Sequence, residues 1–209
     1  LRDASVAPQE IDRIGVVVGP GAFAGVRVGL AFARAFSLGL KAACIGVTSL
    51  EALAASAFPE RQTPDIASAE ARRTYYVAPV IDARRGQVYA ALYDAQGAAI
   101  VDPFVAAPDA ALETITASMG ASAPKPDAGE AKVFILGDGA GLIDGPPDWR
   151  RLERLAIDPS MVARMAMAKE VMATRPAPLY LRPPDAKAPQ QSLFAGLVAG
   201  DTLSESGKG

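Results

Sequence analysis

The sequence predicts an α/β fold, and two observations carry that prediction. Between residues 13 and 57, short apolar runs alternate with segments of helical length and composition, in the order strand, helix, strand, helix. That alternation is typical of a parallel sheet covered by helices. Half of the 209 residues are hydrophobic, so the chain can bury a substantial core.

Residues 13–57 predict two strands, each followed by a helix. A β-branched run bounded by glycine predicts a buried strand over 13–19, and 26–40 has the length and the residues of a helix. The run 42–47 predicts the next strand. Thr48 and Glu51 then have the spacing of a capping box, which opens a helix that ends near residue 57.

The middle of the chain changes to a hairpin pattern. Strand-like segments at 75–83 and 87–94 are joined by "RRG", and a third at 98–106 completes a predicted three-stranded meander. Pro108 is placed to open a helix, since proline is accepted in the first turn.

The remaining segments are shorter. "KVFILGDGAG", from residue 132, predicts a strand that ends in a glycine turn, and Asp158 precedes a helix predicted to run to about Thr174. The proline-rich stretch from Arg175 onward is expected to be extended on the surface. The stretch 121–131 is expected to be a flexible loop.

Composition excludes several classes of protein. The 21 basic residues against 23 acidic ones give a net charge of −2, which argues against strong nucleic-acid binding through a basic surface, although a local patch stays open. The single cysteine, Cys44, is expected to be a buried small residue in a reducing cytoplasm. No uncharged apolar run reaches about eighteen residues, so no membrane span is expected.

Histidine is absent from the sequence. Its absence removes the usual general base, the common nucleophile pairs and the commonest metal ligand. No two carboxylates have a spacing that demands acid–base chemistry. We therefore expect no catalytic residue and no metal site.

The loop after the first strand is rich in glycine, as phosphate-binding loops often are. A Walker loop would need lysine after Gly25, where Val26 stands. Gly19, Gly21 and Ala24 fit a dinucleotide fingerprint, but the acidic residue expected about twenty positions later is missing. Two interpretations stay open: anion contact at Gly19 and Gly21, or a structural turn, which we favour.

The helix that follows has two regular faces. One is a stripe of small residues four apart, which lets another helix approach closely, and the other carries cations seven apart. The small residues are Gly25, Gly29, Ala33 and Ser37, and the cations are Arg27, Arg34 and Lys41. Either the small face packs on the chain's own sheet with the cations in solvent, or the helix is shared with a partner protein.

Several motifs together resemble one family. They are "GPGAFAGVRVGLAFARAFSLGL", "IGVTSLEALA", "VIDARRGQVYAALYD", "LGDGA" and "PLYLRPPDAK". In this order they are similar to the TsaB (YeaZ) proteins of bacterial tRNA threonylcarbamoyladenosine synthesis. The resemblance covers the chain to about residue 190, although "GAFAG" lacks the two hydroxyls of the more usual "GSFTG".

The resemblance implies a two-lobed actin/Hsp70/sugar-kinase-like (ASKHA) α/β fold that is N-terminally truncated. Compared with the family, the chain is expected to lack about fifty residues before Leu1, including a phosphate-turn strand. The implied domains are the rest of the first lobe at 1–60, a second lobe at 61–190, and a tail at 191–209 that is expected to be flexible.

The resemblance also implies a function without catalysis. Such proteins are scaffold subunits that heterodimerise with the transferase TsaD, are joined by the ATPase TsaE, and meet tRNA only through the complex. The chain alone is expected to bind no cofactor, to form a homodimer when unpartnered and to be cytoplasmic, while the complex uses ATP and yields ADP. The implied TsaD contacts are Phe23, Val26, Arg27, Leu30 and Arg34.

A second polar cluster lies at the predicted hairpin. Asp82, Arg84 and Arg85 flank its turn, and Asp138 stands between two glycines. They are expected either to contact an anion or the cleft, or to be turn residues whose charges compensate one another.

Two other functions are compatible with parts of the sequence. One is an ATP-dependent small-molecule kinase of the same superfamily, which needs a phosphate turn and a catalytic aspartate outside this sequence. The other is a glycoprotease-like peptidase, which the absence of histidine disfavours.

Overall fold

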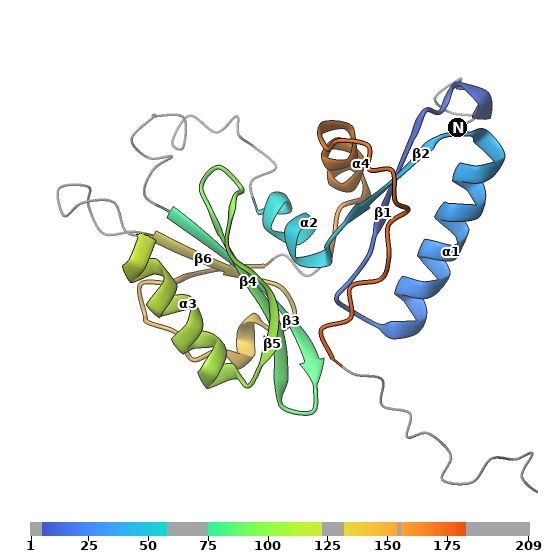
Figure 1. Ribbon diagram of the computed structural model, residues 1–209. Coiled ribbons are helices and arrows are strands. Elements are labelled where there is room, and N and C mark those ends of the chain that lie inside the picture. Colours follow the sequence, from blue (N-terminus) through green and yellow to red (C-terminus); the bar gives the residue numbers. More distant parts are fainter. Residues whose placement is uncertain (1–5, 58–74, 123–131, 154–155, 183–209) are drawn as a thin grey trace, which may run out of the picture.

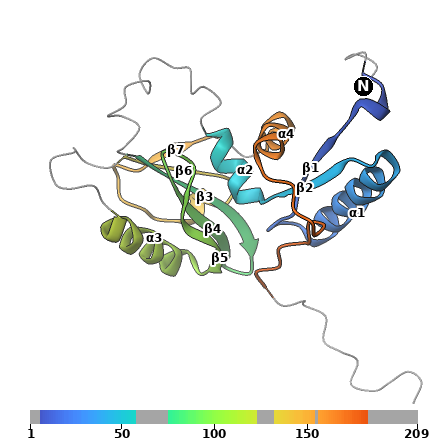
Figure 2. The same cartoon turned by 45° about the horizontal axis from the view of Figure 1, so that its top comes forward.

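The computed structural model describes residues 6–57, 75–122, 132–153 and 156–182. These residues form two sheets, one of two strands in the order β1-β2 and one of five in the order β5-β4-β3-β6-β7. Helix α2 lies between the two sheets in both views (Figures 1 and 2).

The first sheet is a β-α-β unit. Strands β1 (Arg13–Val17) and β2 (Ala43–Val47) pair in parallel, and helix α1 (Phe23–Leu40) connects them. The predicted parallel layer is confirmed, with the helix starting three residues earlier than expected. Buried Leu30 and Ala33 hold α1 against one face of the sheet.

Helix α4 (Pro159–Ala168) covers the other face of this sheet, so closely that a Cβ on Gly15 would lie 2.9 Å from the Cβ of Ala166. It begins directly after Asp158, as predicted, and the Asp158 side chain caps it by accepting from the Ser160 amide. Its predicted extension to Thr174 is wrong.

The helix ends early because its last carbonyls have another donor. The guanidinium of Arg13 donates to the carbonyls of Ala166, Met167 and Lys169, at 3.3, 3.0 and 3.0 Å. From Lys169 to Arg182 the chain contains no further helix, and the Leu179 amide donates to the Val18 carbonyl at 2.8 Å. The expected extended segment is confirmed as far as the described residues reach.

The second sheet contains the predicted meander. β3 (Tyr75–Arg84), β4 (Gln87–Asp94) and β5 (Ala99–Ala106) pair antiparallel, and β6 (Lys132–Leu136) pairs with β3 in parallel. Strand β7 (Arg150–Leu152), which pairs with β6, was not predicted from the sequence. Three residues, two of them arginine, are too few to show an alternating pattern.

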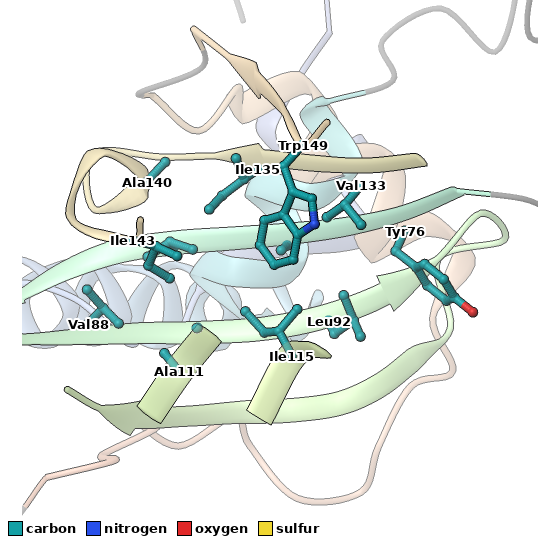
Figure 3. Packing of buried hydrophobic residues seen from close by; sticks show 13 residues of the cluster. Tyr76, Val88, Leu92, Ala111, Ile115, Val133, Ile135, Ala140, Ile143 and Trp149 are labelled. Carbon is teal, nitrogen blue, oxygen red and sulfur yellow. The ribbon is translucent and has the colours of Figure 1, made fainter. Parts of the chain in front are cut away.

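Helix α3 (Pro108–Ser122) covers one face of the five-stranded sheet, and Pro108 opens it as predicted. Its Ile115 points into the core toward Leu92 and Trp149 (Figure 3). The same cluster holds side chains from three neighbouring strands and from the turn after β6, so this half of the molecule has its own apolar core.

Helix α2 (Ser49–Ser56) packs on both sheets. Leu50 and Leu53 belong to a cluster with the five-stranded sheet, whereas Ala52 packs with Val47 and Val162 of the first sheet and α4. The predicted capping box at its start is confirmed: the Glu51 amide donates to Thr48 Oγ1 at 3.0 Å, and the Thr48 amide donates to Glu51 Oε2 at 3.3 Å.

Two polar contacts fix the start of α2 to its surroundings. Lys169 Nζ lies 2.8 Å from Glu51 Oε2, which ties the end of α4 to the cap of α2. Tyr93 of β4 is buried beside Thr48, and burial raises the pKa of its phenol to about 12.

The expected domain boundary near residue 60 and the tail at 191–209 fall outside the described residues, as does the expected flexible loop at 121–131 apart from the end of α3. The division into domains therefore stays a prediction. Among the described helices, α1 alone is long and apolar enough to cross a membrane by length and composition, and it carries two arginines. The expected absence of a membrane span stays a prediction.

We predict that Leu53→Ala will lower the free energy of unfolding by about 2–5 kcal/mol, because it leaves a cavity in the cluster that α2 makes with the five-stranded sheet. Urea denaturation measures the change. Val28→Ala, on the exposed side of α1, is the control, with a change within about 0.5 kcal/mol. Equal effects of the two substitutions would contradict the role of α2.

Candidate functional site

One exposed apolar surface of the described residues lies along α1. Val28, Phe32 and Leu38 are 70%, 69% and 64% exposed. The ring of Phe32 stacks on that of Phe36, with centroids 5.7 Å apart. A helix that presents large apolar side chains to solvent has a surface suited to another protein.

The predicted stripe of small residues does not lie on one face. Gly25 and Gly29 are open, since a Cβ on either would meet no atom within 4 Å. Ala33 is buried against the sheet, and the hydroxyl of Ser37 donates to the Ala42 carbonyl at 2.7 Å. The stripe winds around the helix because residues four apart advance by slightly more than one turn.

The sequence-predicted partner contacts are divided in the same way. Leu30 is only 2% exposed and packs with Val16 and Val18, so it supports the helix from the side of the sheet, and its expected contact with a partner stays a prediction. Val26 is half-buried beside Gly19. The exposed residues Val28, Phe32 and Leu38 were not predicted. The signal for them in the sequence was a large apolar side chain on the side of the helix where an amphipathic helix normally carries polar residues.

The two arginines of α1 bind the chain's own C-terminal segment. Arg34 Nε donates to the Pro176 carbonyl at 3.1 Å. Arg27 Nε donates to the Tyr180 hydroxyl at 2.7 Å, and its guanidinium lies 3.6 Å from the centroid of the Phe23 ring. These residues therefore anchor 176–180 on the side of α1 away from Val28.

The glycine loop is packed by backbone contacts. Gly19 has φ +98°, its carbonyl accepts from the Ser49 amide at 2.8 Å, and a Cβ there would lie 3.2 Å from the Leu179 carbonyl. Gly21 is exposed. This geometry supports the structural-turn interpretation, whereas the anion contact at these glycines stays a prediction.

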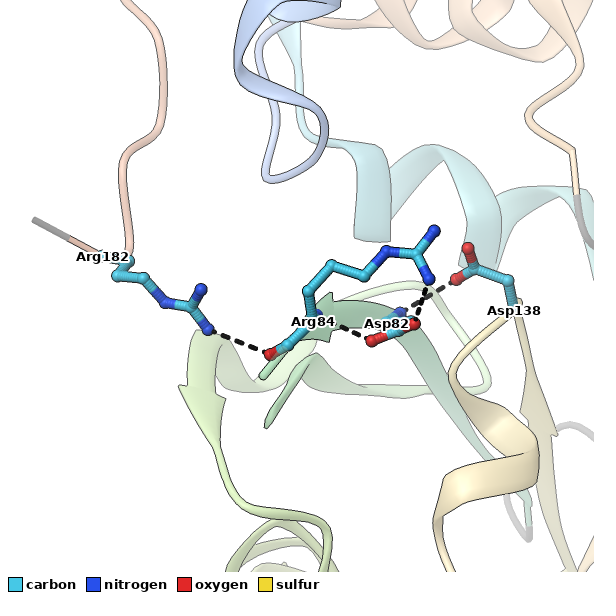
Figure 4. A network of polar contacts seen from close by, with 4 residues as sticks. All are labelled: Asp82, Arg84, Asp138 and Arg182. Atoms are coloured by element: carbon cyan, nitrogen blue, oxygen red, sulfur yellow. Dashed lines mark hydrogen bonds and ion pairs between the residues drawn. The ribbon is translucent and has the colours of Figure 1, made fainter. Parts of the chain in front are cut away.

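The hairpin cluster is assembled by backbone contacts (Figure 4). Asp138 Oδ1 accepts from the Asp82 amide at 2.9 Å, and Asp82 Oδ1 accepts from the Arg84 amide at 2.7 Å. Asp82 Oδ2 pairs with Arg84 Nη1 at 2.9 Å. The turn itself is unusual, because Arg84 and Arg85 have φ +61° and +56°, a region that glycine and asparagine favour.

The glycines beside Asp138 allow this approach. A Cβ on Gly137 would clash with the Val80 carbonyl oxygen, and one on Gly139 would lie 2.7 Å from the Asp82 amide. Arg182 reaches the turn from the C-terminal segment, donating to the Gln87 amide oxygen and, at 3.5 Å, to the Arg84 carbonyl. The structure thus brings together all four residues predicted at this cluster.

Two cavities lie elsewhere. One of about 450 Å³ lies between α2, α4 and the β4–β5 turn, and one of about 260 Å³ lies at the end of α1 beside Cys44. Burial raises the pKa of the Cys44 thiol, which Arg34 and Arg175 partly counteract. In the part of the chain that the structure describes, no group of three or more His, Cys, Asp or Glu residues could hold a metal ion.

The chain is similar to known proteins of tRNA modification. Residues 1–144 match the family model described as TsaD, tRNA N6-adenosine threonylcarbamoyltransferase. The chain is 38% identical over 93 residues to the tRNA threonylcarbamoyladenosine biosynthesis protein TsaB of Bacillus subtilis, a match covering 44% of this chain and 35% of that protein. It is 28% identical to TsaB of Escherichia coli over 87% of this chain and 75% of that protein.

The fold has a solved counterpart. A crystal structure from Pseudomonas aeruginosa, described as an uncharacterized protein with similarity to peptidase YEAZ, superposes with a TM-score of 0.60 at 27% identity. The match covers 87% of this chain and 78% of that one. The expected ASKHA-like α/β fold of the TsaD and TsaB proteins is therefore confirmed.

We predict that Arg34→Gln will raise the exchange rate of the Leu179 amide about tenfold, because the segment is then no longer anchored at Pro176. Hydrogen exchange measured by NMR checks this. Arg164→Gln, an exposed charge on α4, should leave that rate unchanged. If Leu179 stays equally protected in both variants, Arg34 does not hold the segment.

Proposed function

This chain belongs to the family that joins TsaD with its TsaB (YeaZ) relatives, and we propose that it acts as a TsaB-type scaffold in tRNA threonylcarbamoyladenosine synthesis. In this role it binds a TsaD-like transferase and has no catalytic site of its own. The chain matches only about a third of the B. subtilis TsaB, so activity and partners rest on the proposal.

The observation that carries the proposal is the apolar face of α1. On one side of this helix, Leu30 and Ala33 pack on the sheet. On the other side, Val28, Phe32 and Leu38 are exposed to solvent. Open glycines at 25 and 29 allow a second helix to approach this face closely. An exposed apolar surface of this kind marks a site where another protein binds.

The remaining parts of the proposed role are those that the resemblance to the TsaB (YeaZ) proteins implies. A TsaE-like ATPase joins the pair, tRNA is the substrate of the whole assembly, and the assembly works in the cytoplasm. The same α1 face holds two copies together when no TsaD-like partner is present. The sequence contains no histidine, which is the commonest metal ligand and the usual general base, and this supports a non-catalytic role.

Reconstitution tests the function. Threonylcarbamoyl transfer to tRNA is measured with the cognate TsaD-like and TsaE-like proteins and the enzyme that forms the threonylcarbamoyl adenylate, with and without this protein. We expect transfer only when it is present, and none from it alone. Transfer that is indifferent to it would refute the scaffold role.

We predict that Phe32→Glu will weaken binding to the TsaD-like protein at least thirtyfold, since a charge replaces an apolar anchor of about 2 kcal/mol or more in the centre of the face. Isothermal titration calorimetry measures it. Met167→Glu is the matched control, because Met167 is 72% exposed but lies on α4. Equal affinities of the two variants would show that α1 is not the contact.

A further inference from the structure

We propose that one surface strip of this protein binds single-stranded RNA directly. The strip, called the arginine strip below, is made by two aromatic and four arginine side chains from three separate parts of the sequence. Its members are Phe23, Arg27, Arg84, Arg85, Tyr180 and Arg182. The inference rests on the proposed function only for the choice of RNA as the polyanion.

The strip is continuous through named contacts. Arg27 at the start of α1 donates to the Tyr180 hydroxyl at 2.7 Å. Two residues further along the same segment, Arg182 donates to the Gln87 side chain and the Arg84 carbonyl at the hairpin turn. Arg85 is the exposed neighbour of Arg84 in that turn. Four cations from three separate parts of the sequence therefore follow one path over the surface.

Two of the four cations, Arg27 and Arg182, are not neutralised by a carboxylate within the described residues. They donate to a phenol, an amide and a carbonyl. The acids that contact the turn include Asp82, which pairs with Arg84, and Asp138, which accepts from the Asp82 amide. The strip thus presents two cations without a carboxylate partner on a chain whose total charge is −2.

The aromatic members supply a second element of RNA recognition. Phe23 and Tyr180 are each 47% exposed, and their ring centroids lie 5.5 Å apart with 34° between the planes. The Arg27 guanidinium lies over the Phe23 ring. Exposed aromatic rings beside arginines are platforms on which unpaired bases stack while the cations contact the phosphates.

The turn is held in a conformation that costs energy. Two consecutive arginines have positive φ, and Asp82, Asp138 and Arg182 hold the backbone around them. Strain of this kind persists where the surrounding structure fixes it, and it is found at binding sites. In this turn the side chain of Arg84 is 82% exposed.

Fluorescence anisotropy with a fluorescein-labelled anticodon stem–loop RNA tests the strip, on the full chain alone and with its TsaD-like partner. Arg84→Gln with Arg182→Gln should weaken RNA binding about tenfold and reduce the salt slope, by about 0.7 for each phosphate that is no longer neutralised. The matched control, Arg150→Gln with Arg164→Gln, removes two exposed charges outside the strip and should bind as the unaltered chain does.

Two further variants separate charge and stacking from folding. Arg84→Lys with Arg182→Lys keeps the charge and should recover most of the salt slope. Phe23→Leu should weaken binding to the stem–loop but leave binding to an abasic version of its loop unchanged. Circular dichroism confirms that each variant is folded.

Each outcome decides the inference. RNA affinity that falls in the strip variants alone supports it, whether or not reconstituted transfer needs this protein. Equal affinities of the strip and control variants, or no RNA binding at low salt, would overturn it. Titration of the TsaD-like protein into the variant with Arg84→Gln and Arg182→Gln, two positions outside the implied TsaD contacts, should give unaltered affinity, so failure of the scaffold role is seen separately.

Discussion

The structure depends on the burial of one short helix. The residues of α2 are buried or half-buried. One side of the helix packs on the five-stranded sheet, and the other side packs on the first sheet and α4. A helix of eight residues is marginal in isolation, so tertiary packing stabilises it. The cap at Thr48 and the ion pair of Glu51 with Lys169 fix where it starts.

The two sides of α1 that do not pack on the sheet have different surroundings. The first sheet has only two strands in the described residues, and α1 and α4 cover its two faces. Val28 and Phe32 lie on the side of α1 opposite Leu30 and Ala33, which pack on the sheet, so they stay in solvent. The other flank of α1 is occupied by the segment at 176–180, which Arg27 and Arg34 hold. The two flanks of one helix thus support two different proposals.

Local patterns predicted most elements because their signals lie within a few neighbouring residues. The β-α-β order, the capping box and the meander all follow from such signals. The early end of α4 and the strand β7 could not be predicted in this way, because the first depends on the distant Arg13 and the second on pairing with β6. The polar cluster at Asp82 was predicted from the sequence, whereas the exposed apolar side chains Val28, Phe32 and Leu38 of α1 were not.

Composition and short motifs were sufficient for the α/β class and the family, because neither depends on how distant segments meet. Which side of α1 faces solvent was settled by packing, since a helix shows its burial only against the sheet that covers it. Packing also brought arginines at 27, 84, 85 and 182 onto one surface. A nearly neutral composition hides such a strip, because charge counts are sums over the chain, whereas a ligand meets only the charges that folding brings together.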